Sequence, residues 1–237
     1  MQILQLTSAK RMIEQKTHEV TVDIVIFTIR NGSLDVLLVQ RGHEPFKNKW
    51  AIPGGFVRLS ENLEEAAKRV LYEKTHVKDV YLEQLYTFGD PHRYPSARVI
   101  TVSYVALIRS DDLILSSEEG LNIQQISWHP VYKLPALAFD HQAIVSYALK
   151  RLKARLEYTP IAFQLLPKKF TLTELQKTYE SILNHDLDKR NFRKKIVSLD
   201  ILNEHEEFTK ESSKRPARLY SFNEISIEGR KGLMTAQ

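Results

Sequence analysis

A glycine turn that leads into an amphipathic helix sets the strongest limit on how this chain folds. Pro53-Gly54-Gly55 breaks the chain, and residues 61–74 then carry apolar side chains at three- and four-residue steps. A glycine turn at a helix start lets backbone N–H groups approach an anion closely. Carboxylates one turn apart on that helix can hold a divalent metal against a diphosphate. The pattern therefore predicts a phosphate site where the turn meets the helix.

Strand-like segments on both sides of the turn indicate an α+β domain. Residues 20–29 read VTVDIVIFTI and residues 34–40 read LDVLLVQ. The Asn31-Gly32 pair between them predicts a hairpin, because both residues tolerate positive φ. Further strands are expected at residues 80–88, 99–108 and 123–128. Residues 140–156 have the period of a second helix.

The turn and its helix resemble the Nudix box, the signature of a family that hydrolyses nucleoside diphosphate compounds. The box reads Gly, five residues, Glu, seven residues, Arg-Glu-apolar-x-Glu-Glu-x-Gly-apolar. The matching positions are Gly55, Glu61, Arg69, Leu71, Glu73 and Val77. With the flanking segments Trp50–Gly55 and Leu137–His141, the resemblance covers most of residues 18–155. It implies a Nudix-like α/β/α sandwich around a mixed sheet.

The box departs from the family at three positions, and the departures change the expected chemistry. Val70 stands at the first metal-binding Glu, Lys74 at the last Glu and His76 at the glycine. Mg²⁺ needs anionic ligands to polarise a diphosphate and activate water, and Glu73 alone remains of the three clustered carboxylates. At about 4–6 Å, the Lys74 ammonium opposes a metal by a few kcal/mol. We therefore expect no catalytic residue, no metal and no cofactor, so that Gly55, Glu61, Arg69 and Glu73 form a vestigial box.

Residues near the expected cleft are instead candidates for binding an effector. Residues 86–93 resemble the loop that follows the box in Nudix proteins that handle ADP-ribose and related compounds. Phe88 could stack on a ring, and Arg93 could meet a phosphate or a sugar hydroxyl. The alternative is a simple turn at Gly89-Asp90-Pro91 with a solvated arginine. The candidate effector-binding residues are Arg41, Gly54, Gly55, Arg58, Phe88, Asp90 and Arg93.

The second half of the chain predicts a helix-turn-helix. Thr171-Leu172-Thr173-Glu174 is a capping-box pattern, and the helix that it opens has a regular apolar face. After a break at residues 184–186, the segment 187–197 separates apolar side chains from basic ones on opposite faces. A helix that docks by an apolar stripe and presents Arg, Asn and Lys outward is suited to the major groove.

A second basic cluster follows where a winged helix places its wing. Residues 201–202 could begin a strand, residues 204–213 are expected to form a charged loop, and residues 214–222 run into another strand. The candidate DNA-binding residues are Lys189, Arg190, Asn191, Arg193, Lys194, Lys214, Arg215 and Arg218. The alternative is a set of solvated surface charges, which is the usual outcome for charge runs.

The two halves together resemble the Nudix-related transcriptional regulators over nearly the whole chain. The resemblance implies a homodimeric, ligand-responsive repressor that binds double-stranded operator DNA and a small-molecule effector without hydrolysing it. One branch of the family regulates NAD metabolism and senses ADP-ribose or related compounds. Another branch regulates sugar catabolism and senses pentoses such as arabinose, and residues 160–167 are more similar to that branch.

Length and composition supply the remaining expectations. A chain of 237 residues is compatible with two domains. The expected divisions are an N-terminal arm (1–17), a sensor domain (18–156), a linker (157–169), a winged helix (170–226) and a disordered tail (227–237). The absence of cysteine excludes disulfides, cysteine zinc sites and a thiol nucleophile. The charged N-terminus does not fit a signal peptide, and no apolar run approaches ~20 residues, so we expect a cytoplasmic protein without membrane contact.

Two other functions stay open at this point. Glu61, Glu64, Glu65 and Glu73 could recruit a metal by another arrangement, which would make the chain an active Mg²⁺-dependent hydrolase of ADP-ribose or a related compound. The C-terminal domain could also bind RNA or protein, although no cluster of aromatic residues suited to RNA stacking is visible.

Overall fold

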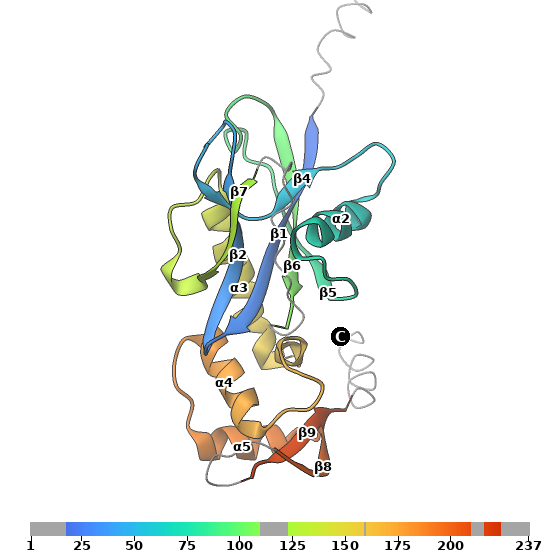
Figure 1. Ribbon diagram of the computed structural model, residues 1–237, viewed down its shortest axis with the longest axis vertical. Helices are drawn as coiled ribbons and strands as arrows, with labels where there is room; N and C mark the ends of the chain where they lie inside the picture. Colours follow the sequence, from blue (N-terminus) through green and yellow to red (C-terminus); the bar gives the residue numbers. More distant parts are fainter. Residues whose placement is uncertain (1–17, 110–122, 159, 210–215, 224–237) are drawn as a thin grey trace, which may run out of the picture.

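The computed structural model describes residues 18–109, 123–158, 160–209 and 216–223, which form two stacked bodies (Figure 1). The upper body is built on a seven-stranded sheet. Its strands are β1 (Glu19–Arg30), β2 (Ser33–Arg41), β3 (Trp50–Ala51), β4 (Gly54–Phe56), β5 (Tyr81–Phe88), β6 (Val99–Leu107) and β7 (Ile123–Pro130). The order is β3-β2-β1-β6-β5, with β4 paired to β1 and β7 paired to β2. Since β1 and β6 are parallel while β1 and β2 are antiparallel, the expected mixed sheet is confirmed.

Two helices cover opposite faces of this sheet. They are α2 (Leu63–Thr75) and α3 (His141–Tyr158). Val22 and Ile24 of β1 pack with α2, whereas Val25 and Phe27 pack with α3, as the alternation of a strand requires. Because both faces of β1 are buried, its sequence is a continuous apolar run rather than an alternating one. The expected α/β/α sandwich is confirmed, and so is the hairpin at Asn31-Gly32, where φ is +49° and +74°.

The glycine segment is a strand and not a turn at a helix start, which corrects the sequence-based prediction. Gly54 and Gly55 lie in β4, opposite Asp23 and Val22. The start of α2 comes later and is closed by a capping box, in which Asn62 and Glu65 exchange side-chain and backbone hydrogen bonds. The predicted junction of the glycine turn with the helix start is therefore wrong. The other end of α2 stops at His76 with φ of +56°, which explains why the family box has a glycine there.

The lower body is a helix-turn-helix followed by a two-stranded wing. Its elements are α4 (Leu172–Leu183), α5 (Lys189–Ser198), β8 (Leu202–Phe208) and β9 (Arg218–Phe222). The predicted capping box between Thr171 and Glu174 is present, and Leu175 is fully buried on the inner face of α4. Phe192 and Ile196 hold α5 in the same core. The expected winged helix is confirmed.

The wing differs from its prediction at residues 204–208, which belong to strand β8 and not to a charged loop. Most side chains of β8 are exposed, because the small sheet packs against the winged-helix core through few residues, namely Leu202, Tyr220 and Phe222. Glutamates can therefore occupy strand positions without the apolar alternation that identifies a half-buried strand. Residues 210–215, which include the candidates Lys214 and Arg215, lie outside the described residues, as do the expected arm and tail.

The segment between the two bodies is mostly buried over residues 161–166 and exposed over residues 167–169. After α3, the short 3₁₀ helix Ile161–Leu165 places Ile161 and Ala162 in the core of the upper body. Phe163 and Leu166, by contrast, belong to the core of the lower body. Residues 161–166 of the expected linker thus contribute side chains to the cores of both bodies. Among the described residues, no helix is both long and apolar enough to cross a membrane.

Hydrogen bonds also join the last turn of α4 to the upper body. The Ser181 hydroxyl donates to the Gly32 carbonyl over 2.9 Å, and the Lys153 ammonium donates to the Leu183 carbonyl over 3.2 Å. The Tyr132 hydroxyl donates to the Ile182 carbonyl. The bonds to Leu183 and Ile182 satisfy backbone carbonyls that the end of α4 leaves without intrahelical partners, whereas the Gly32 carbonyl lies in the turn between β1 and β2. The winged helix is therefore fixed to the sheet domain of its own chain at two places.

Candidate functional site

A cavity of about 260 Å³ lies at the C-terminal end of α2. Its wall is formed by β1, β2, the segment 51–56, the loop after β5 and the start of α3, with Lys74 contributed by α2. Four of the candidate effector-binding residues line it, namely Arg41, Gly54, Gly55 and Arg93. The structure therefore brings together side chains that are far apart in the sequence.

Three other candidates lie elsewhere. Phe88 packs against Tyr86 and Tyr147, at ring-centroid distances of 5.3 and 6.0 Å, and does not line the cavity. The Asp90 carboxylate accepts a hydrogen bond from the His92 backbone over 2.7 Å and so shapes the turn. Arg58 is exposed on the loop before α2. The structure thus does not place these three with the others.

Several lining residues were missed by sequence reasoning. The rings of Tyr94 and Phe139 stack at 5.2 Å, and the Arg41 guanidinium lies 4.8 Å from the Phe139 ring centroid. Asp23 and His141 complete the floor of the cavity. The segment Leu137–His141 carried the family resemblance, but its spacing does not reveal a stack with an aromatic residue from another loop.

The floor of the cavity is held by a buried ion-pair network centred on Arg93. Its guanidinium donates two hydrogen bonds to Asp140, over 2.9 and 2.8 Å, and one to Asp23, over 3.2 Å. The Arg93 side chain is only 3% exposed. The solvated arginine of the alternative interpretation is therefore excluded. Paired charges with satisfied hydrogen bonds are the form in which ions are tolerated in a protein interior.

His141 adds a neutral polar group to this floor. Its Nδ1 accepts a hydrogen bond from the Ile52 backbone over 3.1 Å, so in the neutral ring the proton is on Nε2, 3.8 Å from an Asp23 oxygen. Burial lowers the pKa of His141 below its usual value, against the raising effect of Asp23. The described lining therefore carries three cations, Arg41, Lys74 and Arg93, and one carboxylate, Asp23. Such a wall suits an anionic ligand.

The glycines of β4 are required by close packing. A Cβ on Gly54 would lie 2.0 Å from the Asp23 carboxylate and 3.1 Å from the Val22 carbonyl. A Cβ on Gly55 would lie 3.1 Å from Val70. The glycines thus let β4 pass directly over the Asp23–Arg93 pair and the inner face of α2.

Substitution at Gly54 is expected to destabilise the domain. Gly54→Ala should lower the free energy of unfolding by ~2 kcal/mol, because the new methyl group displaces Asp23 from its buried pairing. Denaturant unfolding followed by fluorescence would measure it. The matched control is Gly89→Ala, whose Cβ would meet only Ile100 at 3.9 Å and should change stability by less than about 0.5 kcal/mol. Equal stability of the two variants would contradict this packing argument.

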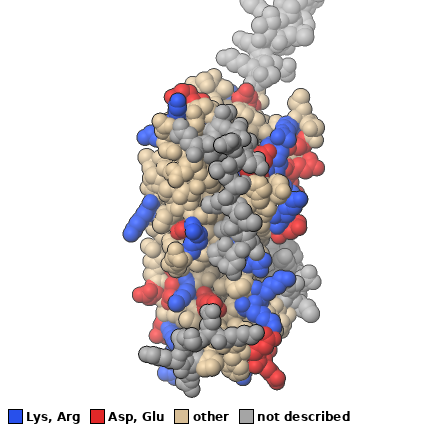
Figure 2. Space-filling view, viewed as in Figure 1, with Lys and Arg blue, Asp and Glu red and all other residues tan. Residues whose placement is uncertain are grey.

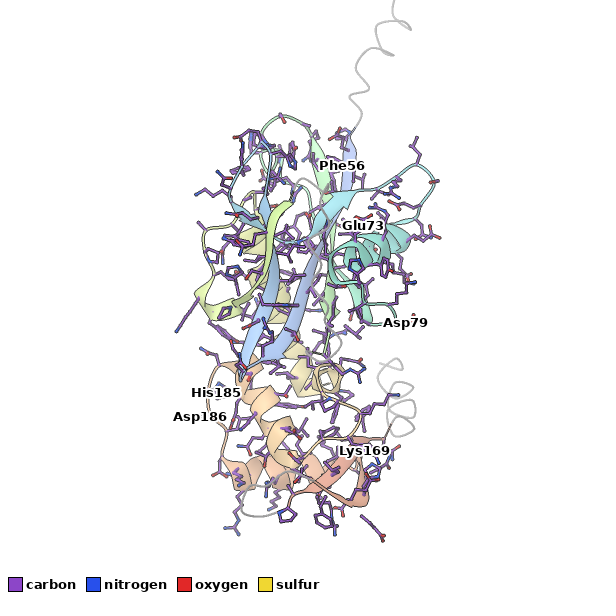
Figure 3. The ribbon with its side chains drawn as sticks, in the orientation of Figure 1. Phe56, Glu73, Asp79, Lys169, His185 and Asp186 are labelled. Carbon is purple, nitrogen blue, oxygen red and sulfur yellow. The ribbon has the colours of Figure 1, made fainter. Side chains whose placement is uncertain are left out.

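The remaining box charges form a cluster outside the cavity. Arg69 donates to Glu61 over 2.9 and 2.6 Å and to Glu73 over 3.2 Å. The hydrogen bond from Arg69 lowers the pKa of Glu61 to about 2. Arg58 lies 3.7 Å from Glu73, which Figure 3 labels on α2. These carboxylates are held by arginines and do not face the cavity.

A divalent metal does not fit the residues present. Val70, at the first metal-binding position of the box, is 1% exposed and belongs to an apolar core cluster. Lys74, at the last, places an ammonium in the cavity wall. Glu73 is bonded to Arg69. The surroundings therefore oppose a metal ion, which needs several anionic oxygens at one point.

The second candidate surface is the outer face of α5, at the end of the molecule farthest from the sheet (Figure 1). Lys189, Arg190, Asn191 and Lys194 are exposed there, while Phe192 is buried. Arg193 was expected to project outward, but it is only partly exposed and turns back to donate to the Thr173 hydroxyl over 3.2 Å. Its position on the flank of α5, beside the start of α4, explains this difference.

Of the candidate DNA-binding residues of the wing, Arg218 is the one that lies among the described residues. Arg218 donates to Glu204 over 2.7 Å and lies 5.8 Å from the Phe208 ring centroid. Figure 2 shows basic side chains interspersed with acidic ones over this body, so no uniform basic face is visible in this view. Within the described residues, the exposed cations of α5 are therefore the strongest candidates for a nucleic-acid contact.

Two family models divide the chain in the same way as the structure. The NUDIX domain model matches residues 17–150, and the NrtR DNA-binding winged helix domain model matches residues 162–222. A curated relative, the "ADPR responsive transcriptional repressor NtrR" of Acinetobacter baylyi, is 40% identical over 204 residues, which is 85% of this chain and 81% of the relative.

Solved structures agree with this assignment. Shewanella oneidensis NrtR, complexed with a 27mer DNA, is similar with a TM-score of 0.75 and 34% identity, over 88% of this chain and 95% of that one. The NUDIX domain of the same protein, complexed with ADP ribose, has a TM-score of 0.52 and 36% identity, over 61% of this chain and 97% of that one. The chain therefore belongs to the NrtR family of transcriptional regulators, in which a Nudix domain precedes a DNA-binding winged helix.

Proposed function

We propose that this protein is a transcriptional repressor that binds operator DNA through α5 and the wing and responds to ADP-ribose bound in the Nudix cavity. The observation that carries the proposal is the cavity wall, to which the basic residues Arg41, Lys74 and Arg93 contribute from three different parts of the chain. A diphosphate is an anion that such a wall can hold. The stacked rings of Tyr94 and Phe139 add a flat apolar surface of the kind on which a base can lie.

ADP-ribose is favoured over a pentose by two findings. The Acinetobacter baylyi relative responds to ADP-ribose by its name, and the similar NUDIX domain from Shewanella oneidensis was solved with ADP ribose. Calorimetric titration with ADP-ribose and with arabinose tests this choice, and binding of arabinose alone would reverse it.

The exposed face of α5 supports the DNA-binding half of the proposal. Its N-terminal residues Lys189, Arg190 and Asn191 lie where the recognition helix of this motif contacts base edges. In a homodimer, two such helices would have to lie ~34 Å apart to reach successive major grooves. Because each winged helix is fixed to its own sensor domain, the effector is expected to change the spacing between subunits, by binding one dimer geometry better than the other.

We also propose that the Nudix domain does not hydrolyse its ligand. The support is the placement of Val70 in the core and of Lys74 in the cavity wall, with Glu73 engaged by Arg69. The hydrolase alternative predicts Mg²⁺-dependent release of AMP from ADP-ribose. Chromatography of ADP-ribose after incubation with the protein and Mg²⁺ tests it, and turnover that disappears in Glu73→Gln would establish the alternative.

A further inference from the structure

The turn between α4 and α5 contains a residue whose backbone is bonded to two side chains of α4. The turn spans residues 184–188, and Figure 3 labels His185 and Asp186 within it. The Glu180 carboxylate accepts a hydrogen bond from the Leu187 backbone N–H over 2.9 Å. The Gln176 amide donates a hydrogen bond to the Leu187 carbonyl, also over 2.9 Å. Both polar backbone groups of Leu187 therefore have a side-chain partner on the preceding helix.

The two side chains are also bonded to each other. Gln176 and Glu180 are four residues apart, so they lie on the same face of α4. The Gln176 amide nitrogen donates over 2.8 Å to the same Glu180 oxygen that accepts from Leu187. An amide group has two N–H donors, and a carboxylate oxygen can accept two hydrogen bonds, so both groups are used fully. We call Gln176, Glu180 and the Leu187 backbone the turn clamp.

The clamp is partly buried and stands directly before α5. Gln176 is 9% exposed, and the Leu187 side chain packs against the core of the winged helix. Asp188 follows at once and caps α5 by accepting a hydrogen bond from the Asn191 backbone over 2.8 Å. A buried polar network whose members are all bonded holds its parts in a single arrangement. The clamp therefore fixes the point at which α5 begins.

We infer that Gln176 and Glu180 are positioning residues for sequence discrimination, which hold the start of α5 where Arg190 and Asn191 can meet base edges. The inference rests on the proposed function, in which α5 contacts operator DNA. Base contacts carry the sequence information, whereas phosphate contacts mainly supply affinity that does not depend on sequence. Base contacts also require that the supporting shell hold the side chains to within ~0.5 Å. Loss of the clamp should therefore reduce the preference for promoter DNA and spare sequence-independent binding.

Anisotropy titrations of the full-length protein with two labelled DNA fragments test this inference. One fragment comes from upstream of the chain's own gene, and the other has the same length and a shuffled sequence. Gln176→Met keeps the side chain's size, removes both amide donors, and should lower the ratio of the two affinities by about tenfold or more. The Kd for the shuffled fragment should stay within about twofold, because every Lys and Arg remains. The matched control is Gln164→Met, which makes the same change at an exposed position and should keep the wild-type ratio.

Two substitutions at Glu180 separate the reach of this side chain from its charge. Glu180→Gln keeps an acceptor oxygen at the same distance and should leave the ratio within about threefold of the wild type. Glu180→Asp keeps the charge, but its shorter side chain cannot span the distance to Leu187, so the ratio should fall by about tenfold. The opposite order, in which Glu180→Gln loses discrimination and Glu180→Asp retains it, would assign the effect to charge and overturn the inference.

A thermal melt of each variant verifies folding, and Glu180→Asp keeps the test decisive if Gln176→Met does not fold. An unchanged ratio in either folded variant would overturn the inference while leaving the proposed function intact. An equal loss of affinity for both fragments would overturn it as well, because a general structural defect has that effect. Wild-type protein that binds the two fragments with the same Kd would instead overturn the proposed function.

Discussion

The double variant Arg190→Ala/Lys194→Ala is expected to bind its promoter DNA at least a hundredfold more weakly than the wild type. Both side chains are exposed on the outer face of α5, on the side opposite to the buried Phe192 and Ile196. An arginine contact to a base edge contributes ~1–3 kcal/mol, and in a dimer each substitution acts twice. The slope of log Kd against log salt should also become shallower, because fewer counterions are released.

Fluorescence anisotropy with a labelled fragment from upstream of the chain's own gene measures this effect. The control is Lys68→Ala/Lys150→Ala, which removes the same net charge from exposed positions on α2 and α3. It should change the affinity by less than about threefold, since these residues lie on the sheet domain. If both double variants lose affinity equally, the effect comes from overall charge, and α5 is not the reading helix.

Replacing Arg93 by Met is expected to lower the free energy of unfolding by ~3–5 kcal/mol. The substitution removes the guanidinium that neutralises the Asp23 carboxylate, whose side chain is only 8% exposed. Breaking a buried ion pair from one side is costly because a buried charge remains. Asp140 is more exposed, at 22%, and contributes less to the loss.

Urea unfolding curves measure this change in the free energy of unfolding. Two further variants test whether the loss comes from the buried ion pair. Arg58→Met removes an arginine that is 63% exposed, and it should cost less than about 0.5 kcal/mol. Asp23→Asn combined with Arg93→Met removes the stranded charge and should recover part of the loss, which a double-mutant cycle quantifies. A loss below about 1 kcal/mol for Arg93→Met alone would mean that the buried network does not organise the cavity.

The elements that could be predicted are those specified by local patterns. The strand β1 follows from its continuous β-branched run and the helix α2 from its apolar period, and the helix α4 follows from its apolar face together with the Thr171–Glu174 capping box. Strand β8 could not be predicted, because its charged and exposed residues lack the alternation that a buried face imposes. The role of Gly54 was also predicted wrongly, because no local sequence pattern indicates its close approach to Asp23.

The candidate site was predictable only where a residue belongs to a spaced motif. Gly54 and Gly55 belong to the box, and Arg41 lies in the approach to it, whereas Tyr94 and Phe139 meet across a long sequence separation. The position of Lys74 was visible as a departure from the box, but its place in the cavity wall required the structure. Phe88 was predicted to stack on a ligand ring because it lies beside a motif. In the structure its ring packs against Tyr147 and does not line the cavity.

The central claim is that an intact ADP-ribose molecule in the cationic cavity controls DNA binding at α5. Anisotropy of the wild-type protein bound to its labelled promoter fragment, followed while ADP-ribose is added in the presence of EDTA, tests it most directly. We predict that the anisotropy falls to that of free DNA as the cavity fills. An unchanged anisotropy at saturating ADP-ribose, or a fall that requires Mg²⁺ and is accompanied by AMP release, would contradict the account.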